Sequence, residues 1–212
     1  MSWPTKKFGE ILVTLFSAFF ALNKKQNLEN NKEPKKEPVL PVPKTKTAEE
    51  LEGEQIMSLL MRSQTNPADS EATKRLRKFI NYEFGLDFEK DHLQCTEYVH
   101  FKVLKELGTK IDWTGRVGPR HGVAWPDQFL TLKRYRVLDM PKKGYTMSFT
   151  AGCTVPPGHV AFVEEVLNDD SIVISEANWP PPGQKEQGQY NKRPLSKKDW
   201  KEKYRGRFVD FS

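Results

Sequence analysis

The spacing of hydrophobic residues along the chain predicts helices first and strands afterwards. Residues 47–63 and 69–85 carry apolar side chains at partly helical spacing, so two helices are expected there. A third helix is expected at 95–107, with Gly108 as its C-terminal stop. Its apolar residues occupy more than one stripe of the helical surface, which is typical of a deeply packed helix. A helical turn is expected at 127–132.

Alternating and β-branched residues predict short strands in the second half of the chain. The expected strands are 146–149, 159–166, 171–176 and 207–211. The alternation is strongest in the second and third of these. Helices that precede a small antiparallel sheet place the chain in the α+β class, with the helices packed on the sheet.

The second and third strands are expected to form a hairpin, because Asn-Asp-Asp between them is a turn signal. A four-residue turn pairs Val166 with Ser171. This register places His159 opposite Asn178, with Glu176 on the same face of the sheet. A slip of one residue would send Glu176 to the other face.

The N-terminal third of the chain has a different composition. Residues 1–25 hold an apolar run between lysines and are interpreted as a signal or anchor segment, with residues 8–22 as the candidate membrane contact. An interfacial helix and an ordinary buried helix are the alternatives. Residues 26–68 form a disordered Lys/Pro-rich linker with one short helix. The folded, catalytic domain is expected at 69–212.

Composition narrows the classes of function. The chain has 212 residues, a formal net charge of +6 and 37% hydrophobic residues. The positive charge suits an anionic partner, for which nucleic acid, acidic lipid and an anionic cell wall are the candidates. The basic clusters at 133–136, 142–143 and 197–207 lack the interleaved aromatic residues of RNA-binding motifs, so no nucleic-acid partner is expected. Zinc-finger spacing, a Walker loop and a dinucleotide fingerprint are absent from the sequence.

Four residues have the chemistry of a cysteine acyl-transfer site. Cys95 falls at the expected start of a helix, where free backbone amides and the helix dipole stabilise a thiolate and an oxyanion. His159 is the candidate general base, and Glu176 or Asn178 would fix its tautomer and ring plane. This set predicts hydrolysis of an amide bond. The alternative interpretation is a buried helix cysteine and a histidine at the end of a strand.

Three stretches resemble the CHAP family of cysteine, histidine-dependent amidohydrolases/peptidases. They are Leu-Gln-Cys-Thr-Glu-Tyr-Val, Gly-His-Val-Ala-Phe-Val-Glu-Glu-Val and Ile-Ser-Glu-Ala-Asn-Trp, in this order. The resemblance covers about residues 70–212 and implies a papain-like α+β fold. Three positions depart from the family pattern: Leu93, Glu97 and Tyr145.

The resemblance implies cleavage of peptidoglycan, at the muramoyl–alanine amide or within the stem or cross-bridge peptide. Cys95 matches the family nucleophile, His159 the base, Glu176 the third member and Asn178 the asparagine that follows it. Gln94, Tyr98 and Trp179 are the candidate substrate-binding residues. A catalytically inactive CHAP-fold module for wall binding or assembly is the alternative function.

Cofactor, partners and location are further expectations. No cofactor or metal is required by this chemistry, although Asp87, Glu89 and Asp91 offer oxygen ligands for Ca²⁺, with a solvated acidic loop as the alternative. A monomer is expected that acts outside the cytoplasm, exported or anchored and facing the wall. A phage-encoded lysin or virion component is the alternative origin.

Overall fold

The computed structural model describes residues 45–63, 70–81, 93–154, 156–179 and 188–212. The chain divides into two compact units, Met1–Thr45 and Lys46–Ser212, and every described helix and strand belongs to the second. The predictions for residues 1–25, for most of the linker and for the acidic stretch at 87–91 lie outside the described residues. Within the described part, no helix combines the length and the apolar character that a membrane span requires.

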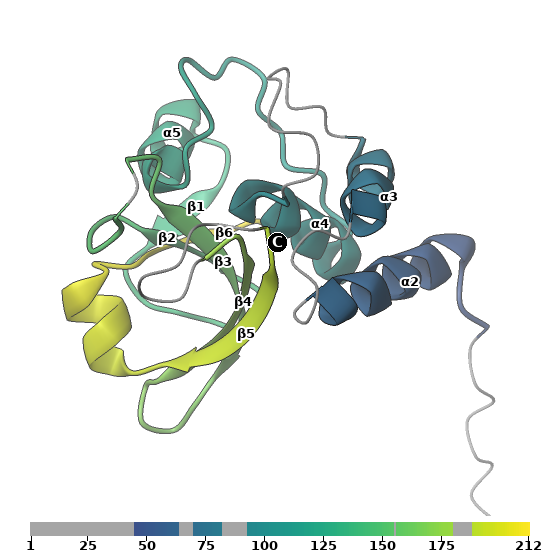
Figure 1. The fold of residues 1–212 in the computed structure, drawn as a ribbon. Helices are drawn as coiled ribbons and strands as arrows, with labels where there is room; N and C mark the ends of the chain where they lie inside the picture. Colours follow the sequence, from purple (N-terminus) through teal and green to yellow (C-terminus); the bar gives the residue numbers. More distant parts are fainter. Residues whose placement is uncertain (1–44, 64–69, 82–92, 155, 180–187) are drawn as a thin grey trace, which may run out of the picture. The chain divides into compact units, whose positions relative to one another are not determined.

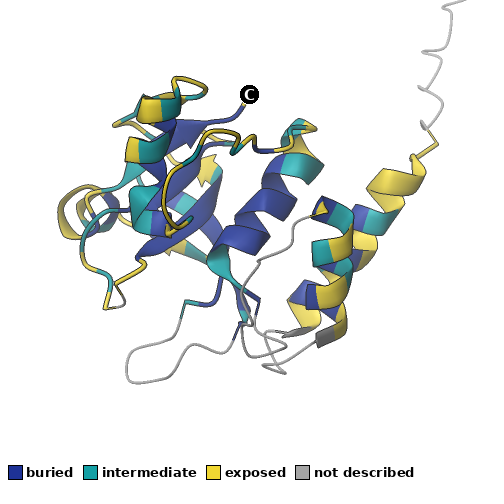
Figure 2. Ribbon diagram, turned by 90° about the horizontal axis from the view of Figure 1, so that it is seen from above, coloured by how far each residue is buried: buried dark blue, intermediate teal, exposed yellow. Residues whose placement is uncertain are grey.

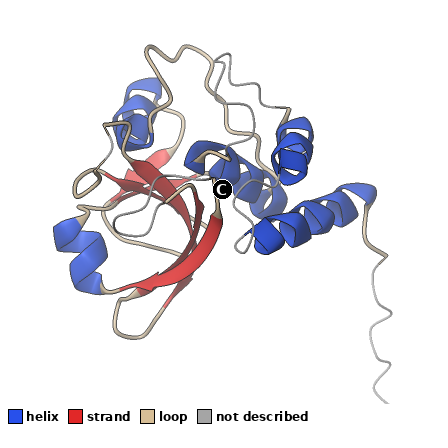
Figure 3. Ribbon diagram, viewed as in Figure 1, coloured by secondary structure: helices blue, strands red, loops and turns tan. Residues whose placement is uncertain are grey.

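A six-stranded antiparallel sheet forms the centre of the second unit, in the order β1-β6-β2-β3-β4-β5 (Figures 1 and 3). The strands are β1 (Arg136–Leu138), β2 (Thr146–Phe149), β3 (His159–Val166), β4 (Ile172–Ala177), β5 (Tyr190–Leu195) and β6 (Arg207–Asp210). Together with the helices, this sheet confirms the α+β class. The four predicted strands are present, whereas β1 and β5 were not predicted.

Helices cover one face of the sheet. They are α2 (Ala48–Ser63), α3 (Ser70–Ile80), α4 (Cys95–Leu107) and α5 (Trp125–Leu132). Helix α4 packs directly on β3 and β4, α3 packs on α4, and α2 packs on α3 (Figure 1). Figure 2 shows the consequence: α4 is buried along most of its length, whereas much of α2 is exposed.

Helix α2 agrees with the helix predicted at 47–63 but differs in its place within the chain, and helix α3 differs in its end. Helix α2 falls in the predicted linker but belongs to the compact unit, because Ile56 and Leu60 are buried in its core. Helix α3 ends at Ile80, earlier than predicted, because Asn81 adopts a left-handed backbone with φ 46°. The start of α4 and its stop at Gly108, with φ 65°, agree with the prediction.

Each face of the sheet has its own hydrophobic core. On the helical face, Phe101 and Val103 of α4 pack against Val160 and Phe162 of β3. On the other face, Ala161 and Val163 of β3 pack against residues that include Trp200. Trp200 belongs to the short π-helical segment η2 (Asp199–Lys203). The alternation of β3 between these cores explains its strong sequence signal.

The β3–β4 hairpin differs in register from the expectation at its turn. Val166 pairs with Ile172 instead of Ser171. Ser171 stays in the turn, because its carbonyl accepts the Leu167 N–H at 2.8 Å and its own N–H donates to the Asp169 carboxylate at 3.1 Å. Beyond a β-bulge between Val163 and Glu165, Phe162 pairs with Ser175, which is the predicted register.

Candidate active site

The candidate nucleophile Cys95 is the first residue of α4, half-buried and not in a disulfide. Gln94 precedes it in an extended conformation, φ −86° and ψ 150°, so the chain turns into the helix at this point. The first backbone N–H groups of a helix have no partner within it and carry its positive dipole end. Cys95 therefore lies where a thiolate and an oxyanion are both stabilised.

A buried carboxylate holds the start of α4. Glu97 is 0% exposed and accepts the backbone N–H of Gln94 at 2.9 Å. Arg77 of α3 forms an ion pair with the same carboxylate. Burial raises the pKa of Glu97. The hydrogen bond from Arg77, the hydrogen bond from the Gln94 N–H and the positive charge of Arg77 oppose this rise. Arg77 thus connects α3 to the turn that carries the nucleophile, a contact that has no signal in the sequence.

His159 lies between Cys95 and Glu176. Its Nε2 is 2.9 Å from Glu176 Oε2, and the Cys95 side chain is within hydrogen-bonding contact of the ring. Burial disfavours the charged ring, but Cys95 and then Glu176 outweigh it and raise the pKa of His159 to about 9. With Nε2 engaged by the carboxylate, Nδ1 is the nitrogen that can exchange a proton with the thiol.

Glu176 is the centre of a charged hydrogen-bond network. It is 0% exposed and accepts Arg193 Nε at 2.6 Å and Asn191 Nδ2 at 3.2 Å, in addition to His159. Burial would raise its pKa, but His159 and Arg193 outweigh burial and lower it. The carboxylate is therefore ionised and fixed in one orientation.

Arg193 and Asn191 belong to the candidate site through these bonds to Glu176, and the sequence alone did not reveal them. Both project from β5, with Asn191 paired directly opposite Glu176 and Arg193 two residues further along the strand. This strand contains Pro194 directly after three consecutive polar or charged residues, 191–193, so its composition does not suggest a strand. Proline is tolerated here because β5 is the edge of the sheet.

Asn178 contacts the nucleophile side of the site. Its Nδ2 donates to Gln94 Oε1 at 3.3 Å, and its Oδ1 accepts the Gly188 N–H at 2.8 Å. Its backbone is left-handed, with φ 59°, which asparagine tolerates better than most residues. Of the two predicted orienting groups, Glu176 bonds to the His159 ring, and Asn178 connects the end of β4 to the loop before Cys95.

The three predicted substrate-binding residues have different environments. Gln94 is partly exposed next to Cys95, and Trp179 is partly exposed with its ring 4.8 Å from that of His159. Tyr98 is 0% exposed and packs 5.5 Å from Tyr190 in the core. Its assignment to substrate contact is therefore wrong, because residues on the inner face of α4 point away from the surface.

Two glycines allow close backbone approach behind His159. A side chain at Gly122, in the short helical turn η1 (Gly122–Ala124), would lie 2.7 Å from the main-chain carbon of His159. A side chain at Gly158 would lie 2.5 Å from Val123, and Gly158 has a φ of 64°. Only glycine fits either position without displacing the strand that carries His159.

A hollow of about 310 Å³ is lined in part by Phe149, whose ring lies 5.0 Å from that of His159. Its wall consists mainly of the segment between β2 and β3, including Phe149, Gly152, Cys153 and Gly158. Burial raises the pKa of the Cys153 thiol to about 11, and the neighbouring Cys95 and Glu176 add to the rise. Cys153 is therefore a protonated thiol at neutral pH, unlike a nucleophile.

A second buried histidine is structural. His100 of α4 contacts the Thr96 carbonyl through Nδ1 at 2.6 Å and accepts the Trp113 indole N–H at 2.8 Å through Nε2. Burial lowers its pKa to about 4, so it is neutral and both ring nitrogens are engaged. Trp125, which is completely buried, packs edge-on against it at 5.4 Å.

Metal ligation has no support in the described part of the chain, where no group of three His, Cys, Asp or Glu side chains is placed to hold an ion. The predicted calcium ligands Asp87, Glu89 and Asp91 lie outside it. Calcium binding stays a prediction.

Comparison with known proteins gives consistent results. A family model described as CHAP domain matches residues 86–178. An N-acetylmuramoyl-L-alanine amidase domain-containing protein of Staphylococcus aureus (strain NCTC 8325 / PS 47) is 41% identical over 90 residues, which is 41% of this chain and 14% of that protein. A crystal structure of an N-acetylmuramoyl-L-alanine amidase from Staphylococcus aureus is 30% identical, covers 61% of this chain and 34% of its own, and has a TM-score of 0.44.

The chain thus spans well under two thirds of either relative. The matched segment includes Cys95, His159, Glu176 and Asn178 and ends directly after the last of them. Arg77 lies before it, and β5 with Arg193 lies after it. The resemblance inferred from three short stretches is confirmed by this match: residues 86–178 are similar to the CHAP domain.

Proposed function

We propose that this chain is a peptidoglycan hydrolase that cleaves an amide bond through a Cys95 acyl-enzyme. The observation that carries the proposal is the position of His159, in contact with the Cys95 thiol on one side and with a buried, ionised carboxylate on the other. The CHAP domain match and the amidase relatives support peptidoglycan as the substrate.

The reaction begins with transfer of the Cys95 proton to His159 Nδ1. Because the pKa of His159 is raised to about 9, the imidazolium form of the ring persists at neutral pH after this transfer. The sulfur attacks the amide carbonyl carbon, and backbone N–H groups at the start of α4 stabilise the oxyanion that forms.

His159 then donates its proton to the amide nitrogen, and the C–N bond breaks to release an amine and leave a thioester on Cys95. A water molecule attacks the thioester while His159 accepts its proton. The acyl product leaves as a carboxylic acid, and His159 returns the proton to the Cys95 sulfur. Glu176 holds the ring throughout and stabilises its charged form.

The complete set of groups favours an enzyme over an inactive wall-binding module. A binding module has no use for a buried carboxylate with three partners directed at an imidazole, because such a network constrains the ring without adding binding surface. Peptidoglycan lies outside the cytoplasm, so the proposed site of action is extracytoplasmic, with residues 8–22 as the proposed export or membrane segment. A monomer is proposed.

The decisive experiment uses purified cell-wall sacculi. Wild type is expected to release new amino groups, and Cys95→Ala and His159→Ala are expected to release none above background. His121→Ala is the matched control, because His121 is exposed. Equal release by wild type and Cys95→Ala overturns the proposal. Mass analysis of the released muropeptides identifies the bond, since a free L-alanine amine indicates an amidase and a new amine within the peptide indicates an endopeptidase.

A further inference from the structure

A β-bulge interrupts β3 close to the turn that joins it to β4. Glu164 is the extra residue, because Val163 pairs with Ile174 and Glu165 pairs with Val173. A bulge places one unpaired residue in a strand and changes which residues share a face beyond it. Its position, between the turn and His159, has a direct effect on the site.

The effect follows from the two registers. At the turn, Val166 pairs with Ile172. If that register continued without a bulge, Phe162 would pair with Glu176. His159 and Glu176 would then lie on opposite faces of the sheet. The extra residue in the bulge shifts the register by one, so Phe162 pairs with Ser175 instead. As a result, Glu176 shares a face with His159.

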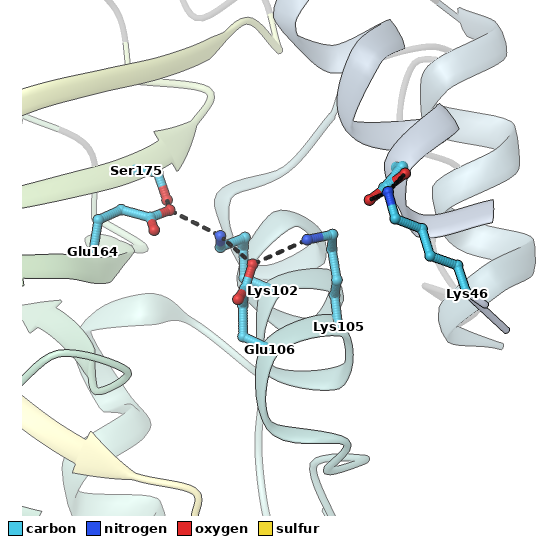
Figure 4. A network of polar contacts seen from close by, with 7 residues as sticks. Lys46, Lys102, Lys105, Glu106, Glu164 and Ser175 are labelled. Carbon is cyan, nitrogen blue, oxygen red and sulfur yellow. Dashed lines mark hydrogen bonds and ion pairs between the residues drawn. The ribbon is translucent and has the colours of Figure 1, made fainter. Parts of the chain in front are cut away.

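Glu164 is anchored from two other elements. Lys102 of α4 forms an ion pair with it at 2.9 Å, and the Ser175 hydroxyl of β4 donates to the same oxygen at 2.5 Å (Figure 4). The Lys102 side chain is only 6% exposed and also lies 4.9 Å above the Phe162 ring. Lys102 Nζ also forms an ion pair with Glu106 Oε1 at 2.9 Å, so two carboxylates contact this ammonium group.

We propose that Lys102 and Glu164 are positioning residues: their ion pair fixes the bulge, and the bulge holds His159 and Glu176 on one face. The pair also joins the helix that carries the nucleophile to the strand that carries the base. A buried ion pair contributes little net stability compared with apolar residues, but it specifies one arrangement over a close competitor. The competitor here is the hairpin without the bulge.

The inference rests on the proposed function only in treating His159 as the base, and its test does not require activity. The titration of His159 is followed by NMR of protein labelled at histidine. Cys95 of α4 and Glu176 of β4 are the titratable groups in contact with the ring, Arg193 of β5 lies behind Glu176, and Cys153 lies nearby. The wild-type midpoint is expected near 9.

Glu164→Ala and Lys102→Met are expected to move this midpoint down toward the ordinary value of 6.5, because the ring loses its carboxylate. Glu164→Gln keeps the size and the acceptor for Ser175, so it is the variant that folds most readily and is expected to shift the midpoint less. Glu165→Ala is the matched control, since Glu165 is exposed and directly follows the bulge. It is expected to titrate like wild type.

The outcomes separate the two proposals. If Glu164→Ala and Glu164→Gln lower thermal stability while His159 titrates as in wild type, the pair is merely structural and the inference is overturned. The same holds if Glu165→Ala shifts the midpoint as far as Glu164→Ala does. If wild type fails to release amines from sacculi, the proposed function fails, and the titration still decides the role of the bulge. In an active enzyme, kcat/KM is expected to fall at least about tenfold in Glu164→Ala and to stay within about twofold in Glu165→Ala.

Discussion

Glu97 and Glu176 are both fully buried carboxylates that pair with an arginine, yet their pKa values shift in opposite directions. Glu97, at the start of α4, has Arg77 and one backbone N–H, and burial prevails. Glu176, in β4, has His159, Arg193 and Asn191, and these partners prevail. The number of charged and hydrogen-bonding partners decides whether a buried carboxylate is stable as an anion.

The difference corresponds to two tasks. Glu97 fixes a backbone turn, which requires an acceptor but no strong negative charge. In the proposed mechanism, Glu176 stabilises a charged imidazole, which requires the anion itself. Substitutions that remove the charge but keep the shape therefore test the comparison.

The largest effect is expected from Glu176→Gln. We expect kcat/KM to fall by about 10³-fold or more, because the imidazolium loses its counter-charge. The pKa of His159 falls below its value of about 9, so the residual activity declines at a lower pH than that of wild type. A pH–rate profile on soluble muropeptides measures both. Glu97→Gln is the matched control, with less than about a tenfold loss expected; an unchanged alkaline limit in Glu176→Gln contradicts the proposed role.

Arg193→Met is expected to have the next largest effect, about 10- to 100-fold in kcat/KM. Without the guanidinium, the pKa of Glu176 rises, so activity begins at a higher pH on the acid side. The acid limb of the pH–rate profile checks this, and Lys192→Met, at the neighbouring exposed position of β5, is the control. An acid limb identical to that of wild type would show that Arg193 does not keep Glu176 ionised.

Arg77→Met is expected to act mainly on stability, at a cost of about 3 kcal/mol, because it leaves the buried Glu97 carboxylate without its cation. The double variant Arg77→Met, Glu97→Gln should recover most of this loss, since neither charge is then buried alone. Urea denaturation of the four proteins measures the coupling. Additive losses in the double variant would contradict the account of Glu97.

The two carboxylates also predict opposite contributions to stability against pH. The folded pKa of Glu97 is raised, so its ionisation costs stability as pH rises above the unfolded value of about 4.5. The folded pKa of Glu176 is lowered, so its contribution is present above about 4.5 and is lost as pH falls through the folded pKa. Over the range from about pH 3 to 7, Glu97→Gln should gain stability relative to wild type as pH rises above about 4.5, whereas Glu176→Gln should lose stability relative to wild type as pH rises toward about 4.5. Thermal unfolding across this range measures the stability of each variant relative to wild type. If both differences changed with pH in the same direction, the distinction between the two carboxylates would be wrong.

The smallest effect is expected from Tyr98→Phe. Tyr98 is completely buried beneath the site, so kcat/KM should stay within about twofold and the Michaelis constant should not change. Trp179→Phe is the comparison, because Trp179 is partly exposed beside His159 and a change in KM is expected there. A raised KM in Tyr98→Phe alone would restore the substrate contact that the structure excludes.

The sequence predicted the parts of the site that local signals determine. The start of α4 at Cys95 and its stop at Gly108 follow from helical periodicity and a glycine, and β3 follows from its alternation between two cores. The face shared by His159 and Glu176 was also predicted, but the bulge that makes it possible was not. One unpaired residue in a strand has no sequence signature of its own, because it depends on Lys102 from another element.

The partners of the two buried carboxylates could not be predicted for the same reason. Arg77 and Arg193 appear in the sequence as ordinary surface charges, and each becomes a partner only when α3 or β5 packs beside the site. The composition of β5 favours a loop, and its pairing with β4 overrides this preference. Tyr98 was predicted as a substrate contact, but its side chain is completely buried and packs against Tyr190, a strand residue whose position the sequence did not predict.

The two arginines lie on either side of the segment that matches the CHAP domain. A protein trimmed to residues 86–178 would retain thiol, imidazole and carboxylate but would lose both guanidinium groups, along with the strand that supports one of them. Fusion proteins and transplanted versions of this domain therefore have to begin before α3 and continue past β5. The segment that sequence comparison recognises is therefore shorter than the segment that holds the side chains around Cys95, His159 and Glu176.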